Sequence, residues 1–251
     1  MRKKLIALMM AALMLLSLAA ACGNDKPAET PTTPTTPAPT TPAPTQPAET
    51  DKKIFYTYLS TEVDTMNGMG TVLEANDVPL SWCNSTLWRA VPNEDGMGYH
   101  YVPDLAADMP KQIDELTWEF SIREDAKWSN GDPINADTYM YTFKTILDPM
   151  MVNAMATFLA DNNITIKNAY DYMLQGTEGH PDVVAWEDVG IKQIDDRTIQ
   201  ITTETPVDEA AFCTHFTTRS NYPVHPELFE ECLSSDRLTT TYGSDLVPCS
   251  M

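Results

Sequence analysis

A regular alternation of apolar and polar side chains marks one strand of this chain. Residues 116–123 place leucine, tryptophan, phenylalanine and isoleucine at every second position, with polar or charged residues between them. A period of two residues predicts a strand with one face on a core. Over residues 135–149 the apolar positions change to helical spacing, behind a capping Asn135 and ahead of Pro149. We therefore expect a strand followed by an amphipathic helix.

The same kind of pattern predicts further elements along the chain. Residues 54–59 are rich in β-branched and aromatic side chains and predict a strand, and residues 189–194 and 198–202 predict the two arms of a hairpin. Residues 92–96 carry turn chemistry. Helices are expected at residues 84–91, 150–159, 168–174, 207–216 and 226–233. Strands and helices that are mixed in this way predict the α+β fold class.

The first 21 residues have the pattern of a signal peptide. Three basic residues precede an apolar run at 5–18, which is too short and wrongly flanked for a membrane span. Three alanines then stand directly before Cys22, as in the lipobox of a bacterial lipoprotein. We expect export, cleavage before Cys22 and lipidation of its thiol, which would anchor the protein on the outer face of the cell membrane. An ordinary signal peptide with an incidental cysteine remains the alternative.

Residues 22–51 are expected to form the lipidated cysteine and a disordered linker. Eight prolines alternate with threonine and alanine between residues 24 and 51, and no large apolar residue occurs there. Such a segment cannot bury enough surface to offset its backbone entropy. Its prolines favour extended polyproline II. The remaining residues, 52–251, form the expected globular part.

Charge and cysteine usage exclude some classes of function. The formal net charge is −20, and nucleic acids and anionic lipids bind basic surfaces instead. Besides Cys22, cysteines occur at Cys83, Cys213, Cys232 and Cys249, in spacings that match no metal template. A disulfide between Cys213 and Cys232 is one pairing among several. The four histidines also stand far apart, so we expect neither a metal site nor a cofactor.

Several blocks of sequence resemble, in order, the extracytoplasmic solute-binding proteins of the oligopeptide/dipeptide-binding family (family 5), which serve ABC transporters. These blocks are EVDTMN at 62–67, LWRAV at 87–91, YVPDLA at 101–106, the strand–turn–helix signature at 107–149, the segment 164–176, the segment 189–203, and YPV at 222–224. The signature contains Trp128 beside an Asn130-Gly131 turn. We expect Trp128 to belong to the core and Asn130-Gly131 to form a tight turn, because both turn residues tolerate positive φ.

The resemblance implies a fold and a function. It implies a periplasmic-binding-protein-like first lobe with an accessory subdomain. Family members are typically more than twice the folded length present here, so the second lobe is expected to be missing. The implied function is the lipid-anchored substrate-binding component of an ABC importer for oligopeptides or dipeptides, without catalysis. The implied partners are a small solute, ABC permease subunits and the membrane.

The resemblance also implies candidate ligand contacts. Residues 74–78 match the segment whose backbone runs beside bound peptide in oligopeptide-binding relatives, so Glu74, Ala75 and Asn76 are candidates. Trp82 is expected either to pack on a ligand or to belong to the core. Arg219 falls where the first lobe faces the ligand and is expected either to pair with a ligand carboxylate or to form a surface salt bridge.

Three other classes of function are alternatives to this one. The closing residues do not resemble the family, which leaves a non-functional truncated gene product as an alternative. A secreted hydrolase is disfavoured because the chain lacks the GxSxG, HExxH and P-loop motifs. A surface adhesin would share the anchor and linker but not the ordered blocks.

Overall fold

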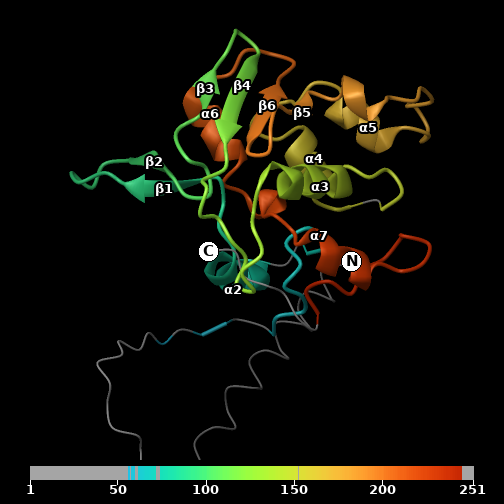
Figure 1. Ribbon diagram of the computed structural model, residues 1–251, viewed down its shortest axis with the longest axis horizontal. Coiled ribbons are helices and arrows are strands. Elements are labelled where there is room, and N and C mark those ends of the chain that lie inside the picture. The colour runs from blue at the N-terminus through green and yellow to red at the C-terminus, as the bar shows by residue number, and fades with distance from the viewer. Residues whose placement is uncertain (1–55, 57, 60–61, 72–73, 152, 245–251) are drawn as a thin grey trace, which may run out of the picture. The chain divides into compact units, whose positions relative to one another are not determined.

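The computed structural model describes residues 56, 58–59, 62–71, 74–151 and 153–244. A four-stranded antiparallel sheet organises one part of it, in the order β3-β4-β6-β5 (Figure 1). Its strands are β3 (Lys111–Gln112), β4 (Thr117–Ser121), β5 (Ile191–Gln193) and β6 (Thr198–Thr202). The predicted strand at 116–123 and the predicted hairpin at 189–202 are therefore confirmed.

The register of this sheet places large apolar side chains on one face. Trp118 lies opposite Ile201, and Phe120 lies opposite Ile199. All four side chains are buried. The intervening Glu119 is only half-buried, as the alternating pattern predicts for the other face of a strand.

Helix α6 (Glu209–His215) covers the buried face of the sheet. Its Phe212 stacks on Trp118 with ring centroids 5.1 Å apart, and Phe216 just beyond the helix lies 5.9 Å from Phe120. Trp88 joins the cluster edge-on, 5.4 Å from Phe120. Figure 1 shows α6 beside β3 and β4. This aromatic cluster is the centre of the core.

The predicted helix at 84–91 is wrong. Residues Trp88–Pro92 form strand β1, which pairs antiparallel with β2 (Tyr99–Pro103) in a separate hairpin. The turn between them uses Gly96 and Gly98 with φ of 72° and 75°, which confirms the predicted turn at 92–96. Pairing with β2 and burial of Trp88 in the aromatic cluster decide the conformation of this segment, and the spacing of apolar residues within 84–91 reveals neither contact.

Most helices lie where periodicity placed them. α3 (Ala136–Ile146) starts with a capping box in which Asn135 accepts from the Thr138 backbone N–H (3.1 Å). α5 (Ala169–Leu174), α6 and α7 (Pro226–Cys232) confirm three further predictions. Two short 3₁₀ helices, η2 (Trp186–Asp188) and η3 (Arg219–Asn221), also lie in this part of the chain. η1 (Glu74–Asn76) and α2 (Asp77–Cys83) occupy a stretch in which no helix was expected.

Helix α4 (Ala156–Ala160) is shorter than the predicted helix at 150–159. The side chain of Asp148 accepts from the Met150 backbone N–H (2.8 Å), and that of Asn153 accepts from the Met155 N–H (2.8 Å). Side chains that bond to nearby backbone groups compete with helix formation. The chain therefore makes turns where apolar spacing alone predicted a helix.

Several expectations concern residues outside the described part of the chain. These are the signal peptide at 1–21, the lipidation of Cys22, the linker at 22–51 and the thiol of Cys249. Of the predicted strand at 54–59, the described residues 56, 58 and 59 carry no strand. No helix among the described residues is long and apolar enough to cross a membrane. Cys213 and Cys232, considered as a disulfide pair, are free thiols.

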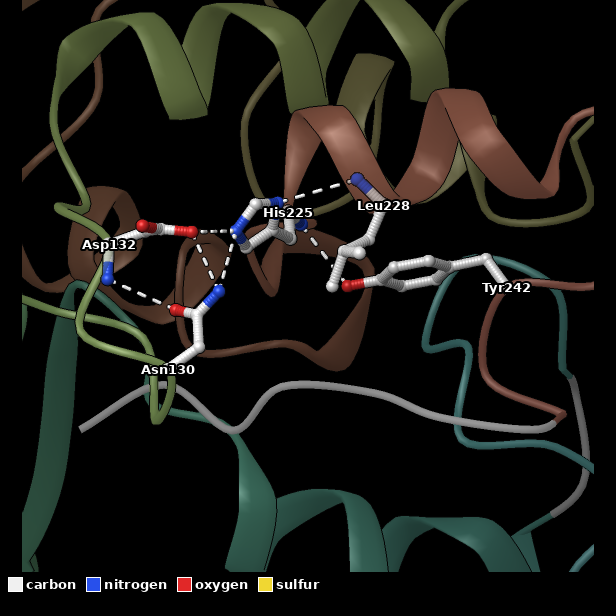
Figure 2. Close-up of polar contacts among 5 residues, drawn as sticks. All are labelled: Asn130, Asp132, His225, Leu228 and Tyr242. Carbon is white, nitrogen blue, oxygen red and sulfur yellow. Dashed lines mark hydrogen bonds and ion pairs between the residues drawn. The ribbon is translucent and has the colours of Figure 1, made fainter.

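A buried histidine joins the Asn-Gly turn to helix α7 (Figure 2). The His225 Nδ1 accepts from the Leu228 backbone N–H (3.4 Å), so the neutral ring carries its proton on Nε2 and donates it to the Asp132 carboxylate (2.8 Å). This bond holds the pKa of Asp132 below its ordinary value. The Tyr242 hydroxyl accepts from the His225 backbone N–H (3.1 Å). One side chain thus caps a helix and fixes the turn.

Replacing His225 with alanine is expected to lower the free energy of unfolding by about 1–3 kcal/mol, because a helix cap and a buried hydrogen bond are both lost. Asp132→Asn is the matched control, since its amide oxygen can still accept from Nε2, and its loss is expected to be smaller. Urea unfolding followed by circular dichroism measures both. Equal losses for the two variants would contradict the capping role.

His215 makes the fold sensitive to acid. Its side chain is fully buried, and burial lowers its pKa to about 4, whereas an unfolded chain has a histidine pKa of about 6.5. As pH falls from about 6.5 to about 4, His215 becomes protonated in the unfolded state but stays neutral in the folded state. The free energy of unfolding therefore falls over this pH range, by up to about 3 kcal/mol relative to its value above pH 6.5. His215→Leu is expected to remove this part of the pH dependence.

Urea unfolding of parent and His215→Leu at several pH values between 7 and 4 measures the effect. His100→Leu, at an exposed histidine of β2, is the control and is expected to keep the slope of the parent. Identical pH slopes for the parent and His215→Leu would rule out this linkage.

Candidate functional site

A cavity of about 490 Å³ lies where α2, the end of α4 and the segment 217–222 meet. α2 and α4 both contact η3. The apolar wall of the cavity consists of Val78, Met155, Phe158 and Tyr222. Val78 and Phe158 are about 40% exposed, so large apolar surface faces the opening. Pockets of about 300–1,000 Å³ with mostly apolar walls and a few polar groups are typical small-molecule sites.

The pocket also contains two opposite charges. Asp77, the first residue of α2, forms an ion pair with Arg219 of η3. The Arg219 side chain is 20% exposed and that of Asp77 is 49% exposed. Solvent, and hence a ligand, can reach both groups.

The buried side-chain amide of Asn221 holds the η3 turn in place. Asn221 Nδ2 donates to the His215 carbonyl oxygen (2.7 Å) and to the Thr218 hydroxyl (2.9 Å). The Thr218 hydroxyl also bonds to that of Ser220 (2.7 Å). These contacts connect the pocket wall to α6 and therefore to the aromatic core.

A glycine lets a second loop pack against this wall. A Cβ atom at Gly68 would lie 3.0 Å from the Arg219 carbonyl oxygen and 3.3 Å from the Tyr222 ring. Tyr222 is thereby enclosed, and burial raises the pKa of its hydroxyl, against the opposing effect of Arg219. The hydroxyl stays protonated at neutral pH.

Of the predicted contact residues, the structure places Arg219 in the pocket and Trp82 outside it. Arg219 lines the pocket, in an ion pair of the kind given as its alternative role. Asn76 is fully buried, and its amide donates to Thr71 (2.8 Å) and to Asp64. Ala75 is half-buried in η1, whose first residue is Glu74. Trp82 is 61% exposed on α2, away from the core, and is not among the lining residues.

Asp77 and Phe158 are pocket residues that sequence reasoning missed. Asp77 lies within the segment 74–78 that the resemblance had marked, but nothing in the sequence pairs it with an arginine 142 positions later. Phe158 was assigned only to a helix.

Two smaller described cavities are weaker candidates. One, of about 260 Å³, lies beside Trp128, Asp132 and His225. Asp132 and His225 bond to each other, as Figure 2 shows. The other, of about 240 Å³, is lined by Met69, Met151 and other residues without a charged side chain. Within the described part of the chain, no three His, Cys, Asp or Glu side chains are grouped as a metal ion would require.

Residues 100–240, more than half of the chain, match the model of the bacterial extracellular solute-binding proteins, family 5. The chain is similar to the periplasmic oligopeptide-binding protein OppA of Escherichia coli, with 32% identity over 130 residues, and to the dipeptide-binding protein DppE of Bacillus subtilis, with 31% over 137 residues. Each alignment covers 52% of this chain, and 22% and 23% of the two relatives.

Solved structures agree with this likeness. The chain is similar to OppA of Listeria monocytogenes bound to peptide, with a TM-score of 0.54 and 26% identity. That match covers 68% of this chain and 30% of the solved one. The fold is thus the mixed α+β fold of periplasmic binding proteins, as expected from the sequence. The matched part spans less than a third of the length of these relatives.

Replacing Asn221 with alanine is expected to lower the free energy of unfolding by about 1–3 kcal/mol, because the buried His215 carbonyl and the Thr218 hydroxyl lose a donor. Ser220→Ala, which removes one hydroxyl contact of the same turn, is the control and is expected to cost less. Urea unfolding measures both variants. If Asn221→Ala were as stable as the parent, the amide would not be what holds η3.

Proposed function

Because this chain belongs to the bacterial extracellular solute-binding proteins of family 5, we propose that it serves as the solute-binding component of an ABC importer, with peptides as the solute. The pocket around Arg219 is then the part of the ligand surface that this chain supplies. Its combination of an apolar wall with two reachable charges is the observation that carries the proposal. The names of OppA and DppE support peptides as the class of solute.

The mechanism needs no bond-making step. In two-lobed binding proteins a ligand is captured by hinge closure, and the closed form has the higher affinity for it. In this chain Arg219 would donate to a ligand carboxylate, and the wall of Val78 and Phe158 would bury an apolar side chain. The closed form would be presented to permease subunits.

Export and lipid anchoring through Cys22 belong to the same proposal. A basic leader, a short apolar run and three alanines before the cysteine support them. An anchored receptor would stay close to a membrane permease. The linker at 22–51 would separate it from the surface.

Binding of defined peptides by the full mature chain tests the solute class. Calorimetric titration with Ala-Phe-Ala is expected to show binding, and Arg219→Ala is expected to weaken it by up to about fivefold, because an ion pair with the ligand carboxylate is lost. Arg237→Ala is the matched control, since it removes an arginine from another ion pair, with Glu230. Unchanged affinity in Arg219→Ala would exclude the arginine from the site.

Labelling with a radioactive fatty acid in a bacterial host tests the anchor. Cys22→Ser is expected to abolish both the label and recovery of the protein in the membrane fraction. Cys232→Ser, at a free thiol of α7, is the control and is expected to keep both. A label that persists in Cys22→Ser would show that this cysteine is not the lipidated residue.

A further inference from the structure

The charges of the pocket are in contact with each other, which restricts the ligands that could use both. Asp77 and Arg219 form a direct ion pair, and both line the cavity. A ligand that engages both must therefore carry its own opposite charges close together.

The distance between the ammonium and carboxylate groups distinguishes a free amino acid from a peptide. In a free α-amino acid, the ammonium and carboxylate groups are attached to the same carbon atom. In an extended peptide, the terminal charges move apart by about 3.3–3.6 Å with every residue. Only the amino acid matches two protein charges that already touch.

Exchange of partners is feasible at this position. Ion pairs near the surface contribute little to stability because water competes for each charge. A zwitterion offers a carboxylate to the Arg219 guanidinium and an ammonium to the Asp77 carboxylate, so neither protein charge is left without a partner when the original pair opens. The fork of the guanidinium can bind a carboxylate through two N–H groups.

The apolar wall indicates the kind of amino acid. Val78 and Phe158 are 40% and 42% exposed at the pocket, beside Met155 and Tyr222. An apolar side chain would remove this surface from water, whereas a charged one would lose hydration there. The volume of about 490 Å³ lies within the range for a small ligand.

We propose that this pocket binds the zwitterion of a free apolar α-amino acid, with its carboxylate on Arg219, its ammonium on Asp77 and its side chain on Val78 and Phe158. The proposal rests on the proposed function in taking this pocket as the ligand surface. It adds a free amino acid, which can engage both charges, to the peptides proposed above, whose carboxylate would engage Arg219 alone.

Titration of the full mature chain with matched ligands tests it. L-phenylalanine is compared with N-acetyl-L-phenylalanine, which lacks the ammonium, and with L-phenylalaninamide, which lacks the carboxylate. In the parent chain each modification is expected to weaken binding by up to about fivefold, because each removes one surface ion pair. In Asp77→Asn the acetyl group should no longer matter, and in Arg219→Gln the amide should no longer matter. Arg237→Gln is the control and should keep the parent's order.

Each outcome decides the proposal. Losses that disappear only in the corresponding variant would support the two assigned contacts. Equal losses in parent and variants would overturn it, as would the absence of phenylalanine binding. If Ala-Phe-Ala bound while phenylalanine did not, this proposal would fail and the peptide function would stand. If neither bound, both would fail.

Discussion

The stacking of Phe212 on Trp118 is the contact on which the rest of the described structure depends. It fastens helix α6 to the buried face of the sheet. Aromatic pairs contribute about 0.5–1.5 kcal/mol beyond their buried area, and here Trp88 and Phe216 extend the pair into a cluster. The segment that follows α6 begins from this fixed point, so the aromatic core sets the position of the pocket wall.

Polar contacts carry that position from the core to the pocket. The His215 carbonyl accepts from Asn221, and Asn221 belongs to the same turn as Arg219. The His215 ring is buried near the Leu159 carbonyl of α4, the helix that supplies Phe158. One histidine therefore links the apolar wall and the charged turn. A disturbance of the core near α6 would reach both halves of the site.

Sequence periodicity predicted the elements that carry a clear local pattern. β4, α3 and the β5–β6 hairpin follow from alternation, capping and turn residues. The helix predicted at 84–91 is wrong, and α2 was not predicted, because the conformation of both segments depends on tertiary contacts. Pro79 lies in the first turn of α2, where proline is tolerated, and β1 forms only because β2 pairs with it. The resemblance made Arg219 a candidate, but its partner Asp77 and the exposed state of Trp82 depend on tertiary packing that no local pattern encodes.

The two parts of the pocket have different energetic roles. An ion pair near the surface is worth about 0–1 kcal/mol, whereas burial of one apolar side chain contributes about 1.5–3 kcal/mol. Affinity in this pocket must therefore come mainly from the Val78 and Phe158 wall, and the charges orient the ligand. Together these terms reach about 4 kcal/mol, which would correspond to a Kd of about 1 mM before the cost of the ligand's lost translational and rotational freedom is subtracted. Tighter binding requires that water be excluded from the Asp77–Arg219 pair, because charge-assisted hydrogen bonds strengthen as the local dielectric falls. A surface that closes over this pocket would therefore raise affinity mostly through the charges that contribute least while it is open.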